Sequence, residues 1–369
     1  MNYQSKKISI FLPSLRGGGA QRVMVNLANG FAERGFLVDL VLVNAEGPYL
    51  SLVNNQVQIV NLKSSRTLAS LPKLINYLKV EKPKSILSTQ DGANVVLLIA
   101  RFLARTPLRV VVRPTNNISS YSQSKYLRAR LMPLFMRWTY SWADAVVAVS
   151  TGLKEEIIQV TKIPEQKLHT IPNPAVTQDI AKAEEPLDHP WFQPNEPPVI
   201  LGVGKLTAQK DFPTLIYAFA KLRTEQPARL MILGEGEDRA KLESLTKELG
   251  IETEVSFPGF VDNPFQYMKR ASVFVLSSRW EGMPNALLQA MACGTPVVST
   301  NCKTGPEEIL ENGKWGHLVP VGNVEALSSA IRETLQGKTQ SPSKAILESR
   351  YGIDTIVEKY LSTLLASSE

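Results

Sequence analysis

The residues at 273–299, VFVLSSRWEGMPNALLQAMACGTPVVS, decide the fold, because they contain a strand, a helix and a second strand in succession. Apolar runs at 273–276 and 296–299 favour two strands, and the apolar pattern at 284–292 has the period of a helix. Pro284 stands where that helix begins, a position that suits its fixed φ angle. A unit of this kind predicts a parallel sheet covered by helices.

The same alternation of short strands and longer helices continues over most of the 369 residues. The other strands are expected at 8–12, 38–43, 56–62, 85–88, 109–112, 145–149, 199–203, 229–233 and 255–257. The other helices are expected at 20–34, 68–82, 93–103, 152–160, 213–223, 238–249 and 324–335. We therefore predict an α/β fold in which parallel sheets carry helices on both faces.

A proline-rich segment divides the chain, with seven prolines between positions 172 and 198. Prolines at this density favour neither a helix nor a central strand. We predict a first domain at 1–175, a linker at 176–197 and a second domain at 198–342. The helical tail at 343–369 is expected to cross back onto the first domain. Two doubly wound domains would face a central cleft, with ligands at the carboxyl ends of their strands.

The composition is that of a folded globular protein, with 44% apolar and 20% charged residues. It excludes a disordered chain, a collagen-like fibre and a disulfide-stapled miniprotein. The two cysteines, Cys293 and Cys302, indicate a reducing compartment. The start of the chain is polar, and no apolar run reaches the length of about 18 residues that spans a bilayer. We therefore expect a cytoplasmic protein without a signal peptide.

Charge is distributed unevenly along the chain. Residues 1–175 hold 22 lysines and arginines against 9 acids, a net charge of +13, and the remainder has a net charge of −6. Between Asp91 and Asp144 there is no acidic residue. The part at 125–142 mixes basic residues with aromatic residues and leucine, as in helices that lie in a membrane interface. The alternative is a core helix with solvated arginines, but the charge of the first domain favours a peripheral site on the inner face of a membrane.

Two glycine-containing loops are candidate ligand sites. Gly18 and Gly19 follow the first strand and open a helix, where the backbone can approach an anion closely, although an ordinary turn is the alternative. The spaced dinucleotide fingerprint is absent. After another strand, Gly204 precedes Lys205 and Lys210, which would converge on a diphosphate unless they are merely a solvated pair.

The loop and helix at 277–292 form the strongest candidate site. Glu281 and Gln289 have the chemistry to bind polyhydroxyl groups through hydrogen bonds. The backbone amides of Asn285, Ala286 and Leu287 at the helix start would point at an anion or a sugar hydroxyl.

Taken in order, these motifs resemble the large retaining glycosyltransferase family four, whose members have two Rossmann-like domains in the B-type glycosyltransferase (GT-B) fold. The resemblance covers nearly the whole chain. It implies that the first domain, at 1–175, binds the acceptor and that the second, at 198–342, binds the nucleotide sugar. It rests on the segments at 18–20, 171–173, 204–210, 234–236, 281–289, 292–298 and 305–309.

The resemblance implies a role for each matching residue. Lys205 and Lys210 would hold the donor diphosphate, and Glu281 would bind the donor sugar, so these three are the expected catalytic residues. Gln289 would bind the ribose. The other expected donor-binding residues are Gly18, Gly19, Gly204, Phe260, Val261, Met283, Asn285, Ala286, Leu287, Thr304 and Gly305.

Three departures from the family pattern concern the site. Gln289 stands where many members have a second glutamate, and Gln21 where many have a glutamate after the glycines. The histidine found near the reacting carbon of many relatives is missing, and His169 and His317 are expected to be ordinary strand-end residues. In its place stands the segment at 113–117, RPTNN, a pattern associated with a branch acting on lipid-linked or capsular glycans. Arg113, Asn116 and Gln21 are therefore the expected acceptor-side residues.

We predict a retaining glycosyltransferase that moves a hexosyl or N-acetylhexosaminyl group from a nucleotide diphosphate sugar, most simply a UDP-sugar, in polysaccharide or glycoconjugate biosynthesis. The expected partners are this donor, a glycan or lipid-linked acceptor and an anionic membrane surface, but no nucleic acid. The sequence contains no Asp-x-Asp motif and no His/Cys cluster, so we expect no metal and no cofactor. The alternatives are a catalytically idle sugar-nucleotide-binding module, a nucleotide-sugar 2-epimerase and a dinucleotide-dependent oxidoreductase.

Overall fold

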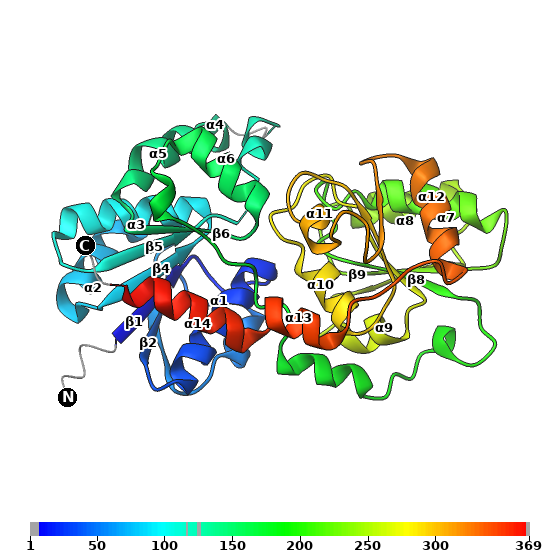
Figure 1. The fold of residues 1–369 in the computed structure, drawn as a ribbon, viewed down its shortest axis with the longest axis horizontal. Coiled ribbons are helices and arrows are strands. Elements are labelled where there is room, and N and C mark those ends of the chain that lie inside the picture. The colour runs from blue at the N-terminus through cyan, green and yellow to red at the C-terminus, as the bar shows by residue number, and fades with distance from the viewer. Residues whose placement is uncertain (1–6, 116, 124–126, 367–369) are drawn as a thin grey trace. The chain divides into compact units, whose positions relative to one another are not determined.

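The structure is a computed structural model that describes residues 7–115, 117–123 and 127–366. The chain divides into two compact units. Unit 1 comprises residues 1–174 and 350–369, and unit 2 comprises residues 175–349 (Figure 1). The break between Pro174 and Ala175 lies at the start of the proline-rich segment.

Unit 1 is built on a seven-stranded sheet in the order β3-β2-β1-β4-β5-β6-β7, and all its strands are parallel. The strands are β1 (Lys7–Leu12), β2 (Leu37–Leu42), β3 (Val57–Asn61), β4 (Ser85–Thr89), β5 (Arg109–Arg113), β6 (Ala145–Ala148) and β7 (Leu168–Thr170). Strand β7 has no range among the strands expected from the sequence, because an edge strand of three residues is too short to show a period.

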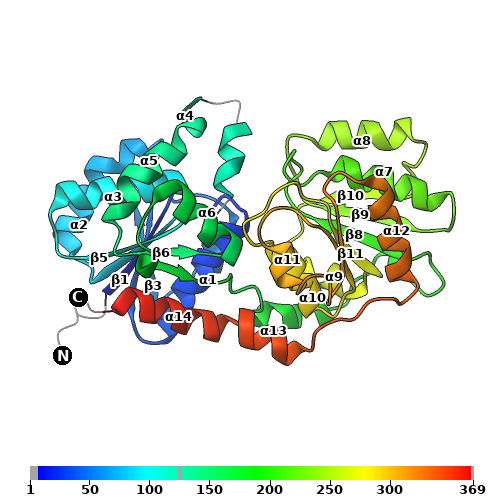
Figure 2. The same cartoon turned by 45° about the horizontal axis from the view of Figure 1, so that its top comes forward.

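Helices cover both faces of this sheet (Figure 2). The helices are α1 (Gly19–Glu33), α2 (Leu71–Glu81), α3 (Asp91–Ala104), α4 (Leu127–Arg130), α5 (Met132–Thr139), α6 (Thr151–Thr161) and α14 (Ile353–Leu365). The apolar faces of α1 and α14 share one core with β1 and β2. On the other side α3 packs between α2 and α5, and α5 packs on α6. Short 3-10 segments complete the connections, among them η4 (Ile118–Gln123) and η5 (Tyr140–Trp142).

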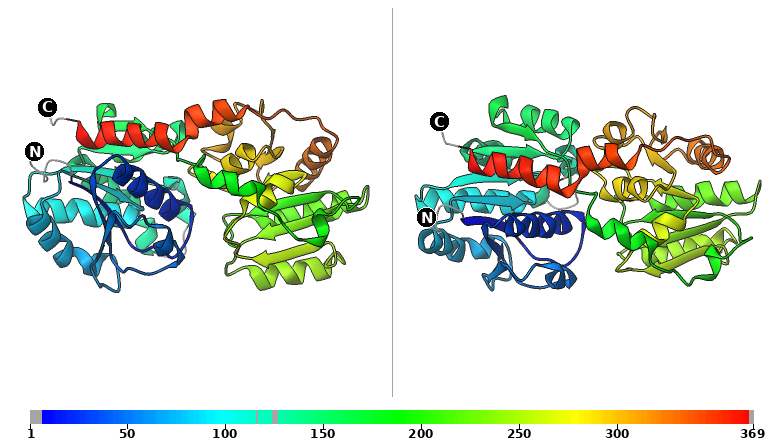
Figure 3. Two further views of the ribbon diagram at one scale, coloured as in Figure 1. Left: turned by 90° about the horizontal axis from the view of Figure 1, so that it is seen from below. Right: turned by 60° about the horizontal axis from the view of Figure 1, so that its bottom comes forward.

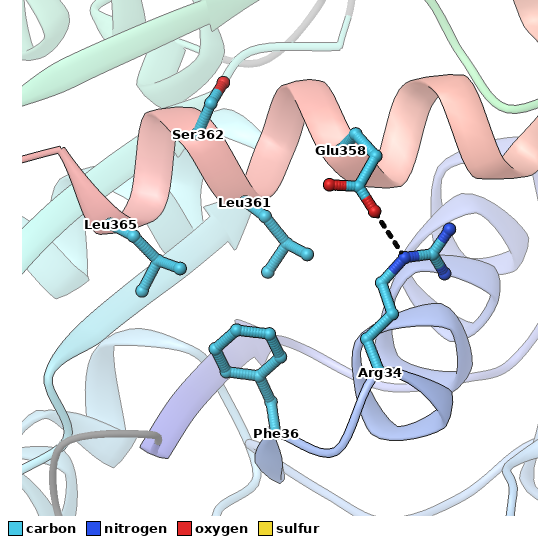
Figure 4. Close-up of a pocket in the computed structure, with 6 residues that line it drawn as sticks. All are labelled: Arg34, Phe36, Glu358, Leu361, Ser362 and Leu365. Carbon is cyan, nitrogen blue, oxygen red and sulfur yellow. Dashed lines mark hydrogen bonds and ion pairs between the residues drawn. The ribbon is translucent and has the colours of Figure 1, made fainter.

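The C-terminal helix α14 is an integral part of unit 1 and runs beside α1 (Figure 3). Its buried side chains belong to the core that contains β1. A Cβ atom on Gly30 would lie 2.6 Å from a methyl group of Val357, so the glycine permits the close approach of the two helices. Arg34 Nε donates to Glu358 at 2.6 Å beside an open hollow of about 430 Å³ (Figure 4).

Unit 2 repeats the plan with a six-stranded sheet of parallel strands in the order β10-β9-β8-β11-β12-β13. The strands are β8 (Val199–Val203), β9 (Arg229–Leu233), β10 (Val255–Gly259), β11 (Val273–Leu276), β12 (Val297–Thr300) and β13 (His317–Val319). The helices are α7 (Phe212–Arg223), α8 (Arg239–Glu248), α9 (Phe265–Arg270), α10 (Asn285–Ala292), α11 (Pro306–Ile309), α12 (Val324–Leu335) and α13 (Lys344–Tyr351). Two parallel, helix-covered sheets confirm the predicted fold class.

The proline-rich segment differs from the expected linker, because it is packed onto unit 2. It forms the 3-10 segments η7 (Gln178–Glu184) and η8 (Pro190–Phe192). Asn263 Nδ2 donates to the carbonyl of Lys182 at 3.0 Å, and Arg270 donates to the carbonyl of Ala183 at 3.1 Å. Prolines cannot donate the backbone hydrogen bonds of a regular helix or sheet, but the carbonyl groups of this segment remain acceptors. Asn263, just before α9, and Arg270, at its end, donate hydrogen bonds to these carbonyl groups.

No helix within the described ranges is long and apolar enough to cross a membrane.

Candidate active site

Three loops of unit 2 meet at the carboxyl edge of its sheet, after the neighbouring strands β8, β11 and β12. Ser277 Oγ donates to the carbonyl of Lys210 at 2.7 Å, and the amide of Arg279 donates to the carbonyl of Gln209 at 2.8 Å. Thr300 Oγ1 donates to the carbonyl of Ser278 at 2.6 Å. These bonds tie the three loops together, and this edge is where parallel α/β sheets bind ligands.

Glu281 and Lys210 form a buried ion pair at this edge. Lys210 Nζ lies 2.5 Å from Glu281 Oε1, and the two side chains are 17% and 8% exposed. Ser278 Oγ donates to the same oxygen at 2.7 Å, and the Thr304 hydroxyl donates to the backbone carbonyl of Glu281. Among the described residues both side-chain bonds therefore go to Oε1, and Oε2 has no protein partner. The carboxylate is held rigidly with one oxygen left to accept a hydrogen bond.

Lys205, on the same loop as Lys210, is differently placed. Its side chain is exposed, and within the described part of the chain it makes no ion pair. The amide of Leu206 donates to the carbonyl of Glu235 at 2.9 Å, which fixes the loop beside it. The two lysines, which have the same expected role from the sequence, therefore have different surroundings in the structure. One is paired with Glu281, and the other is available to an anion.

The close packing of these loops explains the presence of glycine at several of their positions. A Cβ atom on Gly204 would lie 2.9 Å from the Lys210 side chain, and one on Gly234 would lie 2.0 Å from the carbonyl oxygen of Gly204. Gly305 has a φ of 92°, and a Cβ atom there would lie 2.8 Å from the Pro284 ring. Close backbone contact and a positive φ therefore favour glycine at Gly234 and Gly305, whereas at Gly204 the contact is with the flexible Lys210 side chain.

Helix α10 begins beside Glu281, and only part of its predicted amide set is available. The amide of Leu287 donates to the carbonyl of Pro284 at 3.2 Å, and the leucine is fully buried. Leu287 therefore serves the helix and the core, in contrast to its expected ligand role. Asn285, Ala286 and Gln289 are partly exposed on the same helix.

Three further predicted donor residues lie on neighbouring loops. Met283 is buried at the start of α10. Phe260, which follows β10, exposes 56% of its surface, and Val261 beside it is partly exposed. An exposed ring at the end of β10 has the chemistry to stack on a planar group.

Several polar groups of the site were not singled out from the sequence, although most of them lie inside the quoted motifs. Asp211 is buried before α7, where it accepts hydrogen bonds from Thr214 Oγ1 at 2.9 Å and from Arg279 at 3.0 Å. Burial and the negative charge of Glu281 raise the pKa of the Cys302 thiol to about 12, so this cysteine is a neutral packing residue. No spacing rule distinguishes such supporting residues from ordinary loop residues.

In unit 1 the glycine loop after β1 begins α1. Gly17 and Gly18 have φ angles of 114° and 117°, which favour glycine, and Gly19 is the first residue of α1. A Cβ atom on Gly18 would lie 2.9 Å from Gln21 Oε1, so the side chain of Gln21 folds over the loop.

Arg113, predicted on the acceptor side, is buried, and its guanidinium is bonded within unit 1. It is 1% exposed, donates to Thr89 Oγ1 at 3.0 Å and donates to Asn173 Oδ1 at 2.5 Å. Its guanidinium ties β4 and β5 to the segment that follows β7. Asn116, the other residue predicted from this motif, lies outside the described residues.

None of the three histidines is part of the loops described above. His169 is in β7, where burial lowers its pKa, and His317 is in β13. His189, before η8, accepts a hydrogen bond from the amide of Trp191 at 3.2 Å. Across the described ranges, no group of three or more His, Cys, Asp or Glu side chains is arranged to hold a metal ion.

Comparison with known proteins connects this geometry to an enzyme class. A family model described as glycosyl transferases group 1 matches residues 184–350, and one described as glycosyltransferase family 4 matches residues 17–179. Two Rossmann-like units, each built on a parallel sheet covered by helices, are the architecture of the GT-B fold. The chain belongs to this family, with a family 4 region followed by a group 1 region, and is a glycosyltransferase.

Individual relatives agree with this assignment. An uncharacterized glycosyltransferase of Methanocaldococcus jannaschii is 32% identical over 64% of this chain, which spans 60% of that relative. The N-acetylgalactosamine-N,N'-diacetylbacillosaminyl-diphospho-undecaprenol 4-alpha-N-acetylgalactosaminyltransferase of Campylobacter jejuni is 29% identical over 90% of each chain. The crystal structure of HepE from Anabaena in complex with UDP and glucose has a TM-score of 0.79 and 22% identity, covering 98% of this chain and all of that one. The last likeness supports the GT-B fold.

Proposed function

We propose that the protein is a retaining glycosyltransferase that transfers a hexosyl or N-acetylhexosaminyl group from a UDP-sugar to a lipid-linked or capsular glycan. The observation that carries the proposal is the buried Glu281, whose Oε1 is held by Lys210 and Ser278 while Oε2 has no partner among the described residues. A fixed carboxylate with one unused oxygen is suited to accept a sugar hydroxyl.

The donor diphosphate would lie between Lys205 and the start of α10. Lys205 is exposed and forms no ion pair in the part of the chain that the structure describes. The first amides of α10 supply partial positive charge close to Glu281. These groups would stabilise the leaving UDP electrostatically, and they are the basis on which we propose transfer without a metal or a cofactor.

The choice of donor and acceptor rests on the relatives. The Campylobacter jejuni enzyme is named for transfer of N-acetylgalactosamine to an undecaprenol-diphosphate-linked sugar, and HepE was crystallised with UDP and glucose. We extend this donor and acceptor chemistry to the present chain. Retention would follow the front-face course, in which the leaving phosphate accepts the proton of the attacking hydroxyl and the new bond forms on the same face of the sugar.

The donor assignment is tested by calorimetry with UDP, GDP and ADP in the presence of EDTA. If the donor is a UDP-sugar, we expect UDP to bind and the two purine nucleotides to bind at least about tenfold more weakly, because a site that recognises uracil would not accept the larger base equally well. Transfer is then assayed with UDP-glucose, UDP-galactose and their N-acetylated counterparts, using a bacterial lipid extract as acceptor. Binding without transfer would favour the idle module, and appearance of a free epimer would favour the epimerase.

A membrane location is supported by an apolar surface on α4, α5 and η5. We define the apolar stripe as the exposed large apolar residues of these elements, together with Leu131 between α4 and α5. Their exposed fractions are 38–71%: Leu127, Leu131, Leu134, Phe135, Trp138 and Trp142. The opposite side of the same segment, with Met136 and Tyr140, is fully buried. From Leu131 onward the stripe follows the helical spacing, so the segment presents an apolar face outward.

Basic residues accompany the stripe. Arg105 and Arg137 are exposed and have no ion-pair partner within the described ranges, and no acidic residue occurs between positions 91 and 144. Phe102 of α3 stacks on Trp142 with the ring centroids 5.1 Å apart, which widens the apolar surface. An apolar face flanked by cations matches the interface of an anionic membrane, where a lipid-linked acceptor would be available.

The membrane proposal is tested by sedimentation with anionic and with neutral vesicles. We expect binding to anionic vesicles that weakens with salt, and Trp138→Gln should reduce it by roughly tenfold, as expected for loss of an interfacial aromatic side chain. Tyr217→Gln, which changes an exposed aromatic residue of α7 in unit 2, is the matched control. Equal binding to both vesicle types, or no loss in Trp138→Gln, would contradict the proposal.

A further inference from the structure

Two buried carboxylates of unit 1 hold the η4 segment, which follows β5. Glu156 of α6 is 4% exposed, and it accepts hydrogen bonds from the amide of Ile118 at 2.6 Å and from the amide of Ser119 at 3.1 Å. Asn117 Oδ1 also accepts from the Ser119 amide, at 3.0 Å. The start of η4 is therefore fixed from two sides, and one of the fixing groups comes from a helix 37 residues further along the chain.

The middle of η4 is held by the second carboxylate. The Tyr121 hydroxyl donates to Asp91, the first residue of α3, and the Tyr140 hydroxyl donates to the other oxygen of the same carboxylate at 3.2 Å. Asn94 Nδ2 donates to the Tyr140 oxygen at 3.1 Å, which completes a chain of buried polar groups. Burial raises the pKa of Asp91, and it raises the pKa of Tyr121 and Tyr140 as well.

This arrangement is costly for a loop whose purpose is only to connect β5 to α4. Two carboxylates are withdrawn from water, and each needs several hydrogen bonds to offset the loss of hydration. Gln90, just before Asp91, has a φ of 72°, a conformation that a residue other than glycine adopts at an energetic cost. Buried charge and backbone strain are thus concentrated at one place on the carboxyl edge of the sheet.

The place is the one where a doubly wound sheet binds ligands. In the strand order β2-β1-β4-β5, successive strands are added on one side of β1 up to β3 and on its other side from β4 onward, so the strand order reverses between β1 and β4. The loop after β1 carries Gly17 and Gly18. Asp91 follows β4 and η4 follows β5, so the polar chain borders this reversal point on its β4 side. Tyr121, a partly exposed ring held by its hydroxyl, has the chemistry to pack on the apolar face of a sugar.

We propose that η4 is the acceptor-recognition segment of unit 1, that Tyr121 contacts an acceptor sugar, and that Asp91 and Glu156 are positioning residues which act on the acceptor through η4. The inference rests on the proposed glycosyltransferase function and adds to it the residues that replace Arg113 on the acceptor side. Arg113 cannot serve there, because its guanidinium is enclosed between Thr89 and Asn173.

The test compares Glu156→Gln with the matched control Glu155→Gln. Glu155 is the preceding residue of α6, and its side chain is exposed. In Glu156→Gln the amide group keeps the shape of the side chain but replaces one acceptor oxygen with a donor. We expect faster hydrogen exchange at the amides of Ile118 and Ser119 and an apparent KM for the lipid-extract acceptor that rises about tenfold, because a buried amide pair has lost a charged acceptor.

Two readouts separate this role from general damage. The Kd for UDP and the acceptor-free hydrolysis of the UDP-sugar belong to unit 2, and both should stay within about twofold of wild type, as should kcat at saturating acceptor. Glu155→Gln should match wild type in every measurement. If Glu156→Gln fails to fold, Tyr121→Phe provides the same test, since it removes the bond to Asp91 and keeps the ring.

Three results would overturn the inference. One is an unchanged acceptor KM in a folded variant whose Ile118 and Ser119 amides exchange faster. Another is unchanged exchange at these amides in Glu156→Gln, because the carboxylate would then not hold η4. A wild-type protein that transfers no sugar from any UDP-sugar would overturn the proposed function itself, and this inference would fall with it.

Discussion

Because Glu281 and Lys210 form an ion pair, a substitution of Glu281 should also change how Lys210 interacts with the donor. We expect Glu281→Ala to abolish transfer while leaving the affinity for UDP unchanged or increased. In the wild-type protein Lys210 Nζ is bound to Glu281 Oε1 at 2.5 Å, so a diphosphate must share this cation with the carboxylate. Removing the carboxylate frees the lysine for the phosphates and removes the group proposed to bind the donor sugar.

The same variant should lose stability. Breaking a buried ion pair by removing one partner costs about 3–5 kcal/mol, because a charge is left buried without compensation. Lys210 is 17% exposed and can turn partly into water, so we expect about 2–3 kcal/mol in this case. For a unit of this size that loss corresponds to a fall in Tm of about 5–10 °C. Glu281→Gln keeps an acceptor for Lys210 and should lose about half as much.

A double-mutant cycle with Lys210→Ala isolates the pair. We expect the two single losses to exceed the loss in the double variant by about 2–3 kcal/mol, measured by denaturant unfolding. Glu252→Ala, which removes an exposed acid elsewhere in unit 2, is the control and should leave both Tm and UDP affinity unchanged. Additivity within about 0.5 kcal/mol would show that the pair is not coupled.

Calorimetry with UDP and with the intact UDP-sugar completes this test. If the wild-type protein binds the UDP-sugar more tightly than UDP, we expect Glu281→Ala to bind the two ligands with equal affinity. We also expect its transfer rate to fall about 100-fold or more, as for groups that stabilise a reacting oxyanion. The reasoning is refuted if the variant loses affinity for UDP and for the UDP-sugar to the same degree.

Three further predictions concern other residues. Lys205→Ala should weaken UDP binding by about tenfold, which is the value of one charge-assisted contact. The control, Lys247→Ala in α8, should leave the Kd for UDP unchanged, and equal Kd values for the two variants in calorimetry would contradict the role of Lys205. Gly30→Ala should lower the Tm and speed hydrogen exchange in α14, since the added methyl would lie 2.6 Å from that helix and overpacking costs about 1–3 kcal/mol; an unchanged Tm would contradict the packing. Burial raises the pKa of Cys293 and Cys302 to about 12, so neither thiol should react with iodoacetamide at pH 8 before unfolding. Because the unfolded thiols ionise near pH 8.5, at about their ordinary pKa, the free energy of unfolding should fall above that pH, and replacing both cysteines with alanine should reduce the slope.

Much of the fold could be predicted from the sequence because parallel strands buried on both faces form near-continuous apolar runs. The strand at 273–276 and the helix that starts after Pro284 illustrate this. The apolar run of the strand and the position of the proline are both read from neighbouring residues, without knowledge of tertiary contacts. The ranges of the edge strands β7 and β13 could not be predicted, because three residues do not establish a period. The proline-rich segment has the composition of a linker, and its packing on unit 2 cannot be predicted locally because it depends on side chains of and beside α9, far away in the sequence.

The residue types of the site could be predicted from the sequence, but the ion pairs and hydrogen bonds between them could not. Glu281 and Lys210 are 71 residues apart, so their ion pair is a consequence of tertiary structure alone. Arg113 looks like an exposed charge at the end of a strand, and only the structure brings Thr89 and Asn173 to its guanidinium. The carboxylate of Glu156 was passed over for the same reason, because its position on α6 carries no motif.

The central claim is that this glycosyltransferase transfers sugar from a UDP-sugar by means of Glu281. The most direct measurement incubates the wild-type protein and Glu281→Ala with radiolabelled UDP-sugars, a bacterial lipid extract and EDTA, and counts the label in the organic phase. We expect transfer of at least one sugar by the wild-type protein, with the α-configuration of the donor retained in the product by NMR, and background counts for the variant. Transfer by Glu281→Ala at a rate within about twofold of wild type, or a product of inverted configuration, would show that Glu281 does not act in retaining transfer.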